Sequence, residues 1–224
     1  MYVTEDDDRD RPADADVDVF DLEFVATDLS LAGLLRLDIR RPAGATRFLA
    51  SVLRPGEDPV TVLDYDLPLA TGAFEFRAPG VWVEVCCEEP LDHWTIGLEA
   101  FGLAIPAAEV VTPSSFGDRV PLGFDLDLDT VAAPDGDASS FAIEVRVHGD
   151  VLIADRAYEI EATGTRRRSV AGVRHPLRGG DPEILGELTV AWPVQDGRAN
   201  IERRGWFGGS RPGWTRLDSS VDDA

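Results

Sequence analysis

The chain has 224 residues and a formal net charge of −21, and 44% of its residues are hydrophobic. That apolar content is typical of a globular protein, and the length allows a large all-β domain with its own core. The charge argues against nucleic acid and anionic membranes as partners, because binding a polyanion would add repulsion instead of releasing counterions.

All 21 basic residues are arginines. A chain without lysine cannot form a lysine Schiff base, and it lacks the phosphate-binding lysine of a Walker-type loop. The two cysteines, Cys86 and Cys87, are adjacent, so in a strand they point to opposite faces. They make neither an ordinary disulfide nor a zinc site, and we expect a reducing compartment.

The N-terminus is acidic where a signal peptide would be basic, and no apolar run reaches the length of a membrane span. We therefore expect a cytoplasmic protein with no membrane partner. Residues 1–16 (MYVTEDDDRDRPADAD) show no apolar periodicity. Such a segment cannot bury enough apolar surface to order itself, so we expect a disordered acidic tail.

From residue 17 onward, apolar and polar side chains alternate, which predicts half-buried β-strands. Phe20, Leu22 and Phe24 share one face of the first strand, and Asp21 and Glu23 share the other. Further strands are expected at 35–39, 48–52, 60–67, 74–77, 81–86, 94–100 and 122–129, between turns rich in proline and glycine. Residues 103–121 are expected to form a long loop with one irregular strand.

The most regular alternation runs from Ser140 to Gly164. It predicts a long hairpin that turns at Asp155 and Arg156, with one apolar and one polar face. About ten short strands without a sustained helical period predict an all-β, antiparallel barrel or sandwich. We expect this β domain to span residues 17–172, with an irregular C-terminal extension, 173–224, that packs on it or completes it.

Few residues carry a recognisable catalytic or metal-binding pattern. His93, His148 and His175 have no ligand spacing, and the acidic strand DLDLD lacks the loop and glycine of a calcium motif. No serine lies in a nucleophile elbow, and we expect neither a metal nor a cofactor. Residues 166–168, three consecutive arginines, could receive a carboxylate, a phosphate or an acidic surface of the same protein, and we favour internal pairing.

The hairpin EVRVHGDVLIADRAYEIEATGTRRRSVAG, together with HWTIGLEAFG and RVPLGFDLDLD, resembles the lipocalin-like hydroxyneurosporene synthase (carotenoid hydratase) superfamily. The resemblance covers about residues 17–172 and implies a lipocalin-like β fold. Its relatives hydrate isoprenoids or steer pericyclic cyclisations, and they carry the motif G-x-R-D-H-S-W-G.

Gly164, Arg166 and Ser169 match that motif, whereas Arg167 and Arg168 stand where its Asp and His would be, and Val170 replaces its Trp. The residues able to move a proton are thus replaced by guanidiniums, which do not deprotonate.

We therefore expect a non-catalytic, lipocalin-like module that binds a small apolar molecule or a partner protein. One alternative is a hydratase or cyclase acting on an isoprenoid or polyketide, with Glu159 as an acid near Arg166, Ser169 and His175. The other is a structural or interaction protein with a filled barrel. Enzymatic activity and oligomeric state stay open. The candidate ligand-binding residues are Trp82, Trp94, Tyr158, Arg166, Arg168, Ser169 and His175.

Overall fold

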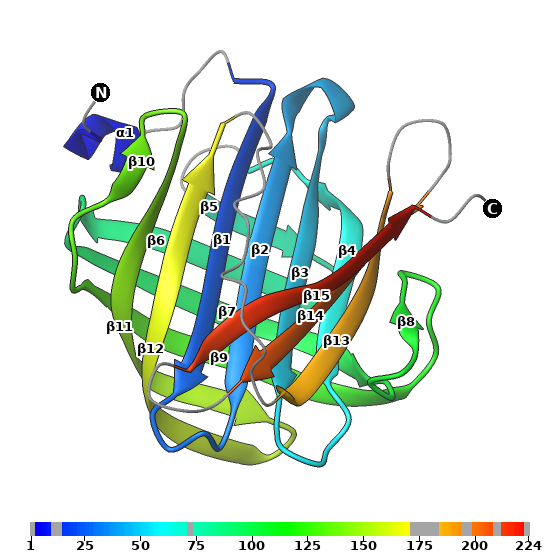
Figure 1. Ribbon diagram of the computed structural model, residues 1–224. Coiled ribbons are helices and arrows are strands. Elements are labelled where there is room, and N and C mark those ends of the chain that lie inside the picture. The colour runs from blue at the N-terminus through cyan, green and yellow to red at the C-terminus, as the bar shows by residue number, and fades with distance from the viewer. Residues whose placement is uncertain are drawn as a thin grey trace.

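A computed structural model describes residues 3–9, 15–70, 74–170, 184–193, 199–207 and 212–221. In these residues the chain is all-β, apart from the one-turn helix α1 (Glu5–Arg9) and the 3-10 turn η1 (Arg41–Ala43). The strands form two sheets, one of eleven strands and one of four (Figure 1). No helix in the described ranges is long and apolar enough to cross a membrane.

The larger sheet is antiparallel throughout, and its strand order is β10-β11-β12-β1-β2-β3-β4-β7-β6-β5. Its ninth strand in chain order, β9, pairs with both β11 and β7, so the pairings run round a closed ring through β1, β2, β3, β4, β7, β9, β11 and β12. The shortest link in this ring joins β4 to β7. The strands are β1 (Val17–Ala26), β2 (Ala32–Arg40), β3 (Ala45–Leu53), β4 (Val60–Pro68), β5 (Phe74–Ala78), β6 (Val81–Glu89), β7 (His93–Ala104), β9 (Asp118–Thr130), β10 (Asp135–Asp137), β11 (Ser140–Ile153) and β12 (Arg156–Ser169).

The inside of the ring holds the main core. The inward residues of each strand form one buried apolar cluster, as their alternation predicts. Aromatic rings meet across it: Phe20 lies 5.8 Å from Trp94, and Phe24 lies 5.9 Å from Phe124, between ring centroids. Among the described residues, apolar side chains therefore fill the middle of the ring.

The predicted hairpin is present as β11 and β12, which pair from Ser140 with Ser169 to Ile153 with Arg156. Its turn lies at Ala154 and Asp155, one residue earlier than expected, and Ala154 takes a left-handed φ of 58°. Within β11, Gly149 has a φ of 127°, and a Cβ there would lie 2.1 Å from the carbonyl oxygen of Asp125. Glycine thus allows β9 to approach β11 closely at this point.

The C-terminal extension was expected to be irregular apart from a plausible strand at ILGELTVAW; that strand is present as β13, but the irregularity expected of the rest is wrong for the described residues. They form β13 (Ile184–Pro193), β14 (Ala199–Phe207) and β15 (Gly213–Val221), which join β8 (Val110–Val111) in the second sheet. This sheet packs on the outward faces of β1, β2 and β3, where a second apolar cluster gathers. The outward faces of these strands are therefore buried as well, which explains why a second layer forms.

Residues 1–16 also differ from the disordered tail that their composition predicts. Within them, Glu5–Arg9 form α1, and Asp8 is fully buried. The physical reason is charge pairing, because guanidiniums inside the ring bind this carboxylate. The region 103–121, expected as a long loop with one irregular strand, contains the short strand β8 and the first residues of β9. The short strand β10, just before β11, was not expected from the sequence.

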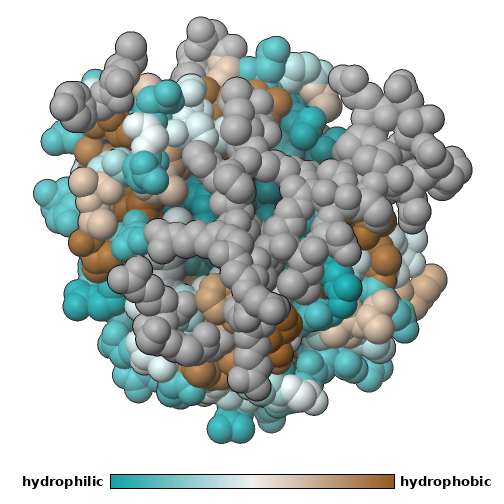
Figure 2. All heavy atoms as spheres, viewed as in Figure 1, coloured by the Kyte–Doolittle hydropathy of each residue, from teal (hydrophilic) through white to brown (hydrophobic). Residues whose placement is uncertain are grey.

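Among the described residues, the exposed large hydrophobic side chains are Phe101, Val110, Phe116, Val131 and Leu152. On the face seen in Figure 2, hydrophobic side chains accordingly form small separate patches among hydrophilic ones.

Candidate functional site beneath helix α1

Two arginines point into the ring because of strand parity. On β12, Ile160 and Ala162 face inward, and the same alternation continues to Arg166 and Arg168. Arg166 lies opposite Leu22, and Arg168 lies opposite Phe20, both of which belong to the core cluster. Both arginines are at most 3% exposed, so each needs a partner for its charge.

Asp8 supplies that partner for Arg166. Its carboxylate accepts two bonds from Arg166, Nη1 to Oδ1 at 2.6 Å and Nη2 to Oδ2 at 3.0 Å. Oδ2 also accepts the indole N–H of Trp94 at 3.0 Å and the backbone N–H of Leu91 at 2.7 Å. Four N–H groups from the larger sheet and its β6–β7 turn therefore converge on one buried carboxylate.

Arg168 fastens the backbone of α1 to the start of β1. Its Nη1 donates to the carbonyl oxygens of Asp7 at 3.0 Å and of Asp8 at 2.6 Å. Its Nε and Nη2 donate to the carboxylate of Asp18 at 3.2 and 3.1 Å. The charge of Arg168 is therefore balanced by Asp18, independently of the Asp8 carboxylate.

Aromatic side chains form the walls around these guanidiniums. The guanidinium carbon of Arg166 lies 4.6 Å from the centroid of Trp94, and that of Arg168 lies 5.7 Å from the centroid of Phe74. Such stacking suits the flat, weakly hydrated guanidinium. Among the described residues, Nε of Arg166 is buried without a hydrogen-bond partner. The site thus combines apolar walls with one spare donor.

Cys87 lies at the edge of the same site. Burial, followed by the negative charge of Asp8, raises the pKa of the Cys87 thiol to about 11. Cys86 points to the other face of β6, as the sequence predicts for neighbours in a strand, and both thiols are free.

The structure brings three of the predicted ligand-binding residues together, namely Trp94, Arg166 and Arg168. The next residue of β12, Ser169, alternates to the other face and lies opposite Val19 and Ser140.

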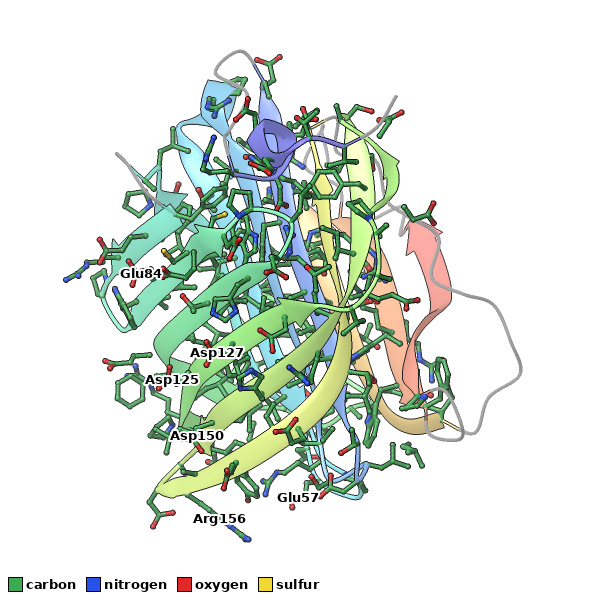
Figure 3. All side chains as sticks on the ribbon, turned by 90° about the vertical axis from the view of Figure 1, so that its left-hand side faces the viewer. Glu57, Glu84, Asp125, Asp127, Asp150 and Arg156 are labelled. Atoms are coloured by element: carbon green, nitrogen blue, oxygen red, sulfur yellow. The ribbon has the colours of Figure 1, made fainter. Side chains whose placement is uncertain are left out.

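The other predicted residues lie elsewhere. Trp82 lies on the outer face, where it packs over Gly97 and donates to Glu75 at 3.0 Å. Tyr158 accepts a bond from Arg54 at 2.7 Å, near the end of the ring marked by Arg156 in Figure 3 and away from α1. Glu159 is exposed on β12, and His175 lies outside the described residues.

Sequence reasoning missed Asp8, the residue that completes the site. It lies in a run of three aspartates, and nothing in that run distinguishes one carboxylate from the next. The available signal was on β12, because extending its alternation past Gly164 places two arginines in an apolar interior, where each requires an anion.

A second polar cluster lies on the outer face of β7, β9 and β11, where Figure 3 shows Asp125 and Asp127. Asp129 bonds to Arg146 at 2.7 Å, to His93 at 3.0 Å and to His148 at 3.2 Å. These bonds, that of Arg146 first, lower the pKa of Asp129 to about 2. Across the described ranges, no three or more His, Cys, Asp or Glu side chains are arranged to hold a metal ion.

A third cluster joins the two sheets. Glu23 accepts bonds from Arg167 and Arg204, each at 2.6 Å, and Arg204 also donates to Glu202 at 2.6 Å. Burial alone would lower the pKa of Arg204, but the surrounding carboxylates of Glu202, Asp21 and Glu23 raise it overall. This network ties β14 to β1 and β12.

Beside this network lies a half-open groove of about 840 Å³, between the outer faces of β11, β12 and β1 and the near part of β14 and β15. Its lining mixes charged, hydroxyl and apolar side chains, including Glu144, Arg146, Glu161, Thr163, Phe207 and Trp214.

Comparison with protein-family models, with curated proteins and with solved structures finds no match to this chain. Its function is therefore inferred from its own geometry.

Proposed function

We propose that this chain is a non-catalytic, lipocalin-like binding module for a small, mainly apolar molecule, and that the ligand binds at the end of the ring beneath α1. One observation carries the proposal: four N–H groups from Arg166, Trp94 and Leu91 converge on a single buried point between aromatic side chains. Small-molecule sites typically have apolar walls and a few convergent polar groups of this kind.

A purely structural role explains this arrangement less well. A buried ion pair is often no more stabilising than apolar side chains of similar volume, because both charges lose their hydration. The middle of the ring is filled by apolar side chains, as a structural protein requires, but the α1 end instead holds Arg166 and Arg168. Binding of a ligand would explain why arginines are buried at this end of the ring, whereas packing alone does not.

A hydratase or cyclase receives less support from the same residues. The superfamily motif would place an aspartate and a histidine where Arg167 and Arg168 stand. Arg168 is held between Asp18 and the backbone of α1, and a guanidinium neither gives up nor accepts a proton near neutral pH. The interior carboxylates Asp8 and Asp18 are both bonded to arginine.

Titration with Nile red, a neutral apolar fluorophore, tests the proposal. We expect saturable binding, with quenching of tryptophan emission by energy transfer to the bound dye. The Trp94→Phe variant should lose much of this quenching, whereas Trp82→Phe, on the outer face, should keep it. Absence of saturable binding, or an equal loss in both variants, would overturn the proposed site.

The groove beside β14 and β15 is a second candidate site, because its 840 Å³ lies within the usual range of small-molecule pockets. Thr163 is exposed on its floor, so Thr163→Trp should fill it without touching the interior of the ring. If this variant abolishes dye binding while Trp94→Phe does not change it, the groove is the ligand site.

A further inference from the structure

We propose that Asp8 is a built-in substitute for a carboxylate on the ligand, and that an apolar monocarboxylate binds Arg166 by displacing helix α1. This inference rests on the proposed function, and it adds the chemical class of the ligand and the way in which the site is closed. It is independent of whether the larger sheet belongs to the superfamily that the hairpin resembles.

The first argument is that the receptor belongs to the sheet and not to the helix. Arg166 comes from β12, Trp94 from β7 and the Leu91 amide from the β6–β7 turn, whereas Asp8 alone comes from α1. Departure of α1 therefore leaves the four N–H groups in place. Leu91 is held at a left-handed φ of 62°, which few leucines adopt, and its N–H points at the carboxylate.

The second argument concerns the charge and shape of the anion. Once Asp8 leaves, Arg166 carries one uncompensated positive charge, because Arg168 stays paired with Asp18. The two terminal nitrogens of Arg166 match the two oxygens of a carboxylate, which is the usual bidentate geometry. A singly charged carboxylate therefore balances the site, whereas a doubly charged phosphate would bury excess negative charge.

The third argument is that α1 depends on its contacts with the sheet and has no stability of its own. It is a single turn of five residues, and a helix of that length has no stability of its own in water. Its attachments inside the ring include the Asp8 carboxylate, the bonds from Arg168 to the carbonyls of Asp7 and Asp8, and the packing of Val3 on the core. A ligand that replaces the carboxylate and covers the aromatic wall with its own apolar chain replaces most of them.

The carboxylate receptor can be tested by chemical rescue. Asp8→Ala removes only the carboxylate group, so acetate should bind in its place and raise the melting temperature of this variant by about 2–4 °C, through preferential binding to the folded state. Acetamide, and chloride at equal ionic strength, should not. Asp6→Ala, which changes an exposed aspartate of the same helix, is the matched control and should not respond to acetate. Equal responses in both variants would overturn the inference.

Displacement of α1 can be tested with decanoate and decanol, which share an apolar chain and differ in the anion. Decanoate should bind Asp8→Ala about tenfold more tightly than the unaltered protein, because the internal competitor is gone. Decanol should bind both proteins equally and more weakly. If decanoate and decanol bind alike to both, the apolar site stands but this inference fails. If neither binds any variant, the proposed function itself fails.

A measurement on the unaltered protein keeps the test decisive if Asp8→Ala does not fold. The amide of Asp8 donates to the carbonyl of Thr4 at 3.2 Å, so its hydrogen exchange reports on the presence of α1. Saturating decanoate should speed this exchange at least about tenfold, because it shifts the helix towards its open state, and decanol should not. Unchanged or slower exchange with bound decanoate would show that α1 stays in place.

Discussion

The three consecutive arginines of β12 serve two different regions, because alternation sends them to opposite faces of one strand. Arg166 and Arg168 point into the ring and bind α1, whereas Arg167 points outward and joins Glu23 and Arg204 between the two sheets. Both regions bury charge. The arginines inside the ring bind one helical turn, whereas the outer network joins the two sheets to each other. Under the proposed displacement of α1, the inner ion pair is exchangeable because its partner lies on one helical turn, whereas the outer pair is permanent because both partners lie in sheets.

The outer network should respond most strongly to mutation. Arg204→Met would leave the carboxylates of Glu23, Glu202 and Asp21 buried without their shared cation, and breaking such a network costs about 3–5 kcal/mol. Urea unfolding would measure this loss.

The matched control is Arg203→Met, on the same strand. Arg203 is exposed and, among the described side chains, pairs with Glu187 at the surface, so its removal should cost less than about 1 kcal/mol. Equal losses for Arg203 and Arg204 would contradict the distinction between the surface pair and the buried network.

The inner pair should show an intermediate effect. Asp8→Ala should destabilise the protein by about 2 kcal/mol, because it leaves the buried Arg166 guanidinium without its carboxylate partner. Adding Arg166→Met should recover most of this loss, since an apolar side chain of similar length removes the unpaired charge. Urea unfolding of the two single variants and the double variant gives the coupling energy, and additive losses would show that the two residues act independently.

The pKa of the Cys87 thiol should also respond to the loss of Asp8, with a smaller effect than that on stability. Its pKa, about 11, is raised by burial and by the charge of Asp8, so Asp8→Ala should lower it and speed its alkylation. The measurement is the pH dependence of iodoacetamide labelling in a Cys86→Ser background, with Asp6→Ala as the control. An unchanged pKa would mean that Asp8 does not influence this thiol.

The exposed Asp129 cluster should have the smallest effect. The bonds from Arg146, His93 and His148 hold the folded-state pKa of Asp129 at about 2, below its ordinary value of 3.8. The stabilisation is therefore present above about pH 4 and is lost as the pH falls towards 2. Asp129→Asn should flatten the fall in melting temperature over that range, whereas Asp125→Asn, on the same strand face, should not.

Much of the larger sheet could be predicted from the sequence, because burial on one face requires a period of two. Phe124, Leu126, Phe141 and Val145 are all buried as that period predicts. The predicted set of site residues was less complete. Trp94, Arg166 and Arg168 do meet, but Trp82 lies on the outer face and Tyr158 lies near the opposite end of the ring. Parity says which face a residue shares and not which residues of distant strands converge.

The sequence ILGELTVAW was expected as a further strand and forms most of β13, but the last two strands, β14 and β15, escaped prediction. Trp206 and Trp214 are buried in the second cluster, yet Glu202 and Arg204 near them are buried too, so no simple alternation marks the segment. Their charges become tolerable only when Glu23 and Asp21 of β1 lie against them.

The amino-acid sequence by itself determined that the fold is all-β and which residues face inward on most strands of the larger sheet, because a strand with one buried face repeats apolar side chains every two residues. Only the tertiary structure decided which charges lie together. The pairing of Asp8 with Arg166 spans 158 positions of the chain, and that of Glu23 with Arg204 spans 181. Contacts at such separations depend on the three-dimensional closure of the ring and the packing of the second sheet, which no local pattern encodes.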